Sequence, residues 1–71
     1  MELFILKTNV LSLAMKEKLA LQLNQIPQII KWSVDYEDCD GVLRASADGI
    51  CIHELISLVK ESGFECEELN D

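Results

Sequence analysis

Residues 30–47 read IKWSVDYEDCDGVLRASA, and this stretch decides the fold. From Ile30 to Glu37, apolar and polar side chains alternate with the two-residue period of a strand that has one buried face. Asp40 and Gly41 then form the dipeptide typical of a type I′ turn, in which both central residues have positive φ. The stretch therefore predicts an antiparallel hairpin closed by a two-residue turn.

A two-residue turn at this point also predicts the register of the hairpin. The cross-strand pairs that it implies are Cys39–Val42, Glu37–Arg44, Tyr36–Ala45 and Val34–Ala47. Large apolar residues would then meet small ones on the buried face, and opposite charges would meet on the open face. Both kinds of pair stabilise a sheet.

Two stretches beside the hairpin have helical periodicity. The first follows Ser12, the expected N-cap, and ends at Pro27, with the turn over residues 25–28. The second follows Gly49 and ends at Gly63, a residue suited to a helix C-cap. The expected core-facing residues are Met15, Leu19, Leu23 and Ile26 in the first helix, and Ile52, Leu55, Ile56 and Val59 in the second.

Two apolar runs at the ends of the chain complete the pattern. Residues 3–8 have strand length, and we expect Phe4 and Leu6 to face inward, with the opposite facing of Leu3 and Ile5 as the alternative. Residues 64–69 form a short last strand whose glutamates suit a sheet edge. The open face of the sheet is expected to carry Lys31, Ser33, Asp35, Glu37, Arg44 and Ser46.

The order of these elements is β-α-β-β-α-β, and no linker or repeat interrupts it. With right-handed crossovers this order predicts a ferredoxin-like two-layer sandwich of the α+β class. In that fold a four-stranded antiparallel sheet has two helices on one face. One domain is expected to cover residues 1–71.

The composition excludes several classes of function. The chain has 71 residues and a net charge of −7 with no basic run, so neither nucleic acid nor an anionic membrane surface is expected as a partner. No segment is typical of a signal peptide or a membrane helix. Three widely spread cysteines favour free thiols in the cytoplasm. With one histidine and no phosphate-binding glycine loop, we expect no enzyme.

Three segments resemble the heavy-metal-associated domain, the family of small copper chaperones and of the N-terminal modules of metal-transporting ATPases. The matching segments are LNQIPQI (23–29), WSVDYE (32–37) and LISLVKESGF (55–64). The resemblance covers nearly the whole chain and implies the same fold. The family's Met-x-Cys-x-x-Cys metal loop is absent, because Val10, Ser12 and Met15 occupy its three ligand positions. A hydroxyl and one thioether are poor ligands for a soft metal ion, so no cofactor is expected.

Other soft ligands keep copper or zinc open as an alternative. Met15, Cys39 and Cys66 are the candidates, and the topology places them toward the end of the domain that carries the first loop. Cys51 and His53 lie toward the opposite end. Because residues two apart on a helix point in different directions, we expect a buried thiol and an exposed imidazole there.

Two surface features indicate a protein partner. Leu13, Ala14 and Leu21 lie off the core-facing stripe and predict an exposed apolar strip. In the resembled family the same helix and first loop dock partner domains. Four acidic residues, which we expect to alternate faces along the hairpin strand, form a solvated acidic surface, and attraction of a basic partner is the functional alternative: Asp35, Glu37, Asp38 and Asp40. The candidate interaction surface is thus Leu13, Ala14, Leu21, Asp38 and Asp40.

The sequence therefore predicts a non-enzymatic cytoplasmic domain that contacts a protein partner or a second copy of itself. The alternative is a soft-metal binding or trafficking protein that uses Met15, Cys39 or Cys66. A third hypothesis is a regulatory module like the amino-acid-sensing domains of this topology. Those domains use glycine in the first connection, where this chain has none.

Overall fold

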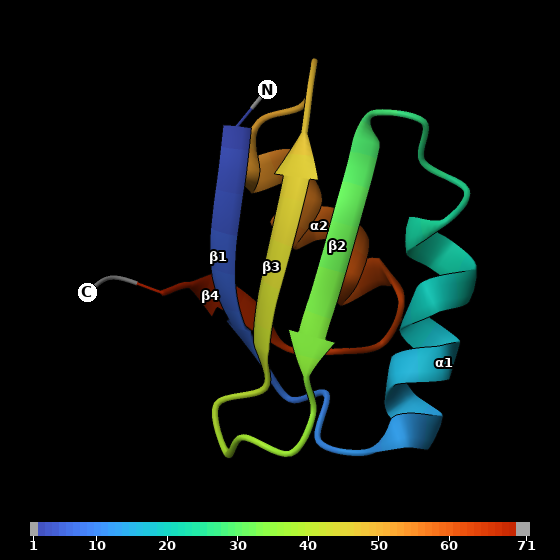
Figure 1. The fold of residues 1–71 in the computed structure, drawn as a ribbon, viewed down its shortest axis with the longest axis vertical. Coiled ribbons are helices and arrows are strands. Elements are labelled where there is room, and N and C mark those ends of the chain that lie inside the picture. The colour runs from blue at the N-terminus through green and yellow to red at the C-terminus, as the bar shows by residue number, and fades with distance from the viewer. Residues whose placement is uncertain (1, 70–71) are drawn as a thin grey trace.

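The computed structural model describes residues 2–69 and has the predicted ferredoxin-like βαββαβ arrangement (Figure 1). Its elements are β1 (Glu2–Thr8), α1 (Leu13–Leu23), β2 (Ile29–Asp35), β3 (Val42–Ala47), α2 (Ile52–Glu61) and β4 (Cys66–Glu68). The sheet is antiparallel and its strands lie in the order β2-β3-β1-β4. None of the helices in this part of the chain has the length and apolarity to cross a bilayer.

The core lies between the sheet and the two helices. Leu19 and Leu23 of α1 and Leu55 and Val59 of α2 are buried in it, as the helical spacing predicts. The opposite face of the sheet is left uncovered, and Figure 1 shows α2 behind the sheet with nothing in front of it. The predicted two-layer arrangement is therefore confirmed.

The central strand β1 faces as expected. Phe4 and Leu6 are buried in the core, whereas Leu3 is 62% exposed on the uncovered face. The alternative facing, with Leu3 and Ile5 inward, is therefore wrong.

The start of α1 follows the prediction, but its end does not. The Ser12 hydroxyl accepts a hydrogen bond from the Met15 N–H at 3.2 Å and so caps the helix. The helix ends at Leu23, with Asn24 as the C-cap, before it reaches Pro27. The Asn24 side chain accepts a hydrogen bond from the Trp32 indole at 3.0 Å, which joins this helix end to β2.

The hairpin forms in a register that differs from the predicted one. Its pairs are Asp35–Val42, Val34–Leu43, Ser33–Arg44 and Trp32–Ala45, so the partner on β2 lies four residues earlier than expected. Residues 36–41 form a longer loop in place of the two-residue turn. Because four is an even number, the paired residues from Lys31 to Asp35 keep their predicted faces. The expected Glu37–Arg44 pair does not form.

Aspartate side chains explain this longer loop. Asp35 Oδ1 accepts the Glu37 N–H at 3.3 Å, and Asp38 Oδ1 accepts the Asp40 N–H at 2.9 Å. The Gly41 N–H also donates to the Asp38 carbonyl at 2.9 Å. Such local bonds give the backbone an alternative to the strand ladder. The acidic residues after Asp35 therefore lie in a loop and do not alternate along a strand.

A bulge displaces one residue expected on the inner face of β2. Ile29 pairs with Ala47 and Lys31 pairs with Ser46, so Ile30 is the extra residue between them. Ile30 is 59% exposed, and Ile29 packs against the core in its place. The expectation that Ile30 faces inward is wrong for this reason.

Candidate functional site

Three segments meet at the end of the molecule drawn at the bottom of Figure 1: the loop after β1, the hairpin loop and the approach to β4. The Thr8 N–H donates to the Asp40 carbonyl at 3.1 Å. The Glu65 N–H donates to Asn9 Oδ1 at 2.8 Å. The loops that carry or adjoin Cys39 and Cys66 therefore lie at the end of the domain that carries the first loop, as the topology predicts.

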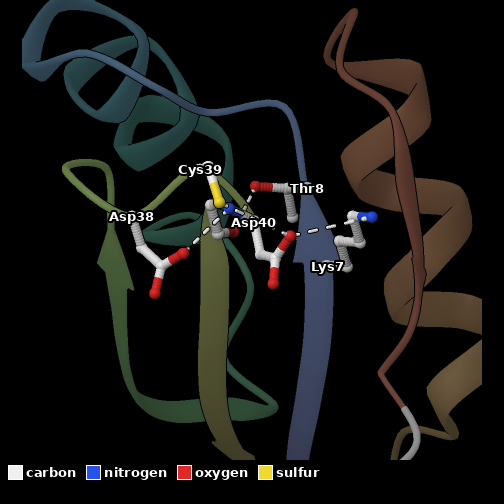
Figure 2. A network of polar contacts seen from close by, with 6 residues as sticks. Lys7, Thr8, Asp38, Cys39 and Asp40 are labelled. Carbon is white, nitrogen blue, oxygen red and sulfur yellow. Dashed lines mark hydrogen bonds and ion pairs between the residues drawn. The ribbon is translucent and has the colours of Figure 1, made fainter.

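A polar network anchors the hairpin loop to β1 (Figure 2). The buried Thr8 hydroxyl donates to the Gly41 carbonyl at 2.6 Å and accepts the Val10 N–H at 3.1 Å. On the solvent side, Lys7 Nζ lies 3.7 Å from Asp40 Oδ1. Gly41 has a φ of +48°. A Cβ at this position would lie 2.6 Å from the Thr8 carbonyl oxygen, so only glycine fits here.

The positions that correspond to the family's metal ligands have other roles. Val10 is buried in the core, and the Ser12 hydroxyl is occupied by its helix cap. Met15 is 39% exposed and does not begin the core stripe as expected, because its thioether turns back to accept the Leu11 N–H at 3.5 Å. These groups do not fit a soft metal ion, which prefers thiolate pairs.

The two cysteines proposed as alternative ligands differ in exposure. Cys39 is exposed in the hairpin loop, and its Sγ can share a ligand sphere with carboxylate oxygens of Asp38 and Asp40, all within 4.8 Å of one another. Cys66 is buried at the start of β4, and this burial raises the pKa of its thiol to about 11. Near neutral pH Cys66 therefore stays protonated and is a poor metal ligand.

The other suggested pair, Cys51 and His53, does not join any group of three metal-ligating side chains in the described chain. Cys51 is exposed at the N-cap of α2 and makes no capping hydrogen bond. The expected burial of this thiol is wrong, because the residue lies outside the helix and beyond the core. His53 is exposed, as the sequence predicts.

Exposed apolar side chains lie on the outer side of α1 and in the loop before it, with the exposed Glu17 between Leu13 and Leu21. Leu13 and Leu21 are 51% and 68% exposed, and Ala14 beside them is also exposed. Leu11, which the helical pattern does not include because it lies in the loop, adds to this surface. We call these four residues the α1 apolar surface: Leu11, Leu13, Ala14 and Leu21.

Some charged side chains beside the α1 apolar surface already contact other groups of the chain, whereas others are exposed. Lys16 and Lys18 lie over the rings of Tyr36 and Phe64, with 5.6 and 5.9 Å from Nζ to the ring centroids. Asp38 is exposed, whereas Asp40 is half-buried and paired with Lys7. Asp38 is therefore the more available carboxylate for a partner.

The chain has no match among family models or curated proteins. Among solved structures it is similar to the solution structure of the yeast copper transporter domain Ccc2a, determined in apo and Cu(I)-loaded states. The TM-score is 0.79 and the sequence identity is 18%, over 97% of this chain and 96% of that one. The resemblance to heavy-metal-associated domains is thereby confirmed at the level of the fold.

Proposed function

We propose that this chain is a non-enzymatic protein-interaction domain that has the fold of heavy-metal-associated domains but lacks the Cys-x-x-Cys pair of that family. The observation that carries the proposal is the exposure of Leu13 and Leu21 on a helix whose opposite side is buried in the core. Exposed apolar side chains gathered on one surface are typical of contact sites.

The charge of the chain indicates what kind of partner fits. The net charge is −7, and the hairpin loop, which carries the exposed Asp38, lies at the same end of the fold as the start of α1 (Figure 1). A partner with an apolar patch rimmed by lysine or arginine would bury the leucines and be attracted by the carboxylates. Three unpaired cysteines support a reducing, cytoplasmic setting for this contact.

Replacing both Leu13 and Leu21 with glutamine should abolish the contact while leaving the fold intact, because both side chains are largely exposed. Light scattering measures self-association of the unmodified chain and the variants. The immobilised domain is also used to retain partner proteins from source cells, and each purified candidate is then titrated against the unmodified chain and the variants. The matched control is Leu3→Gln, an equally exposed leucine on the sheet face. Equal binding by the double variant and the control would contradict the proposal.

A second candidate function is metal binding at Cys39. The grouping of its thiol with the carboxylates of Asp38 and Asp40 favours this function, since zinc accepts sulfur and oxygen ligands. In this case the reduced protein should bind one Zn(II) or Cu(I) in competition with a chelator. Cys39→Ser should lower that affinity at least tenfold, whereas Cys51→Ser, at another exposed cysteine, should leave it unchanged. Equal affinity in all three proteins would exclude Cys39 as a ligand.

A further inference from the structure

A groove of about 430 Å³ lies away from the hairpin loop, between the connection that joins α1 to β2 and the outer side of α2. Its apolar lining comes from Ile26, Ile50 and Leu58, all of which are half-buried. Glu54 and Glu61 line the same groove and are exposed. It shares no residue with the α1 apolar surface, so it is a separate feature of the molecule.

The two glutamates of the groove are aligned along the axis of α2. Glu54 and Glu61 are seven residues apart on α2, so they lie on nearly the same line along the helix and about 10.5 Å apart. Leu58 lies between them along that line. The groove therefore offers an apolar floor with one carboxylate toward each end.

Nothing in the lining neutralises these carboxylates. No lysine or arginine lines the groove. Within residues 2–69, the ion pair that forms joins Lys7 and Asp40 at the far end of the fold. A ligand that brings two cations and an apolar side chain would satisfy both parts of the groove at once.

We infer that this groove binds a basic amphipathic helix of another protein, laid alongside α2. A helix with two lysines or arginines one heptad apart presents cations at the spacing of Glu54 and Glu61, with leucine-type side chains between them. A second copy of this chain does not supply such a segment. The lysines of α1, Lys16 and Lys18, are two residues apart and lie over aromatic rings, and α2 carries only Lys60.

The test is a titration of the isotope-labelled protein, followed by NMR, with a synthetic helical peptide that presents two lysines one heptad apart and a pair of leucines between them. We expect saturable shift changes centred on Ile26, Ile50 and Leu58. The double variant Glu54→Gln/Glu61→Gln should bind about fivefold more weakly, the size of effect that two exposed ion pairs produce. The peptide with its leucines replaced by glutamine should not bind.

The matched control removes two exposed carboxylates elsewhere, Glu65→Gln/Glu68→Gln, and should bind the peptide as the unmodified chain does. A peptide that does not bind, shift changes that spread over the acidic loops, or equal weakening by the control would each overturn the inference. The variant Leu13→Gln/Leu21→Gln should bind this peptide normally. The experiment therefore distinguishes loss of peptide binding at the groove from loss of partner binding at the α1 apolar surface.

Discussion

Leu55→Ala is expected to lower the free energy of unfolding by about 3 kcal/mol. Leu55 is fully buried where α2 meets the sheet, so its truncation removes apolar contacts and leaves a cavity. A domain of this size has a total stability of about 4 to 10 kcal/mol. The variant should therefore lose between a third and most of its stability, measured by urea unfolding.

Leu21→Ala is the control for this prediction. Leu21 is 68% exposed on the outer side of α1, and alanine is a strong helix former, so the change should stay within about 0.5 kcal/mol. Equal losses at the two positions would show that α2 does not form the described core.

Gly41→Ala is expected to destabilise the fold by about 3 kcal/mol. The residue has a φ of +48°, which costs a side chain about 1 to 2 kcal/mol. Its Cβ would also lie 2.6 Å from the Thr8 carbonyl oxygen and 2.9 Å from the Val10 carbonyl oxygen. These are backbone atoms that cannot move aside without disturbing β1. The loss is measured by thermal or urea unfolding.

Gly63→Ala is the control for the steric contribution to the loss at Gly41. Gly63 also has a positive φ, of +96°, but a Cβ there would have no atom within 4 Å. We expect this variant to lose only the backbone contribution, about 1 kcal/mol. If both alanine variants lost the same stability, the close contact between the hairpin loop and β1 would be contradicted.

The alternation of residues 30–37 predicted the correct fold and the correct faces from Lys31 to Asp35, yet it could not predict the bulge at Ile30 or the hairpin register. Period-two patterns specify a face, and a shift of four residues leaves every face unchanged. The choice between registers depended on Asp35 and Asp38, whose side chains bond to the loop backbone. Asp40-Gly41 is a strong turn signal, but here Gly41 serves a longer loop because it contacts Thr8.

The candidate surfaces also include residues that the sequence predicted and residues that it could not predict. Helical angles alone predicted the exposure of Leu13, Ala14 and Leu21, because one helix specifies their relative positions. Leu11 lies in a loop without periodicity, so no pattern included it. The groove joins Ile26 to Ile50 and α2, segments far apart in the sequence that only the folded chain brings together.

The bulge at Ile30 has a consequence for how copies of this chain behave when crowded. β2 is an edge strand seven residues long, and an edge of that length is a template on which another chain can add as a new strand. A bulge bends and twists such a strand, and Lys31 next to it adds a charge that a flat cross-β stack does not accommodate. The other edge, β4, is only three residues long and ends in two glutamates. The sheet is thus protected against aggregation at both edges, by distortion on one side and by shortness and charge on the other.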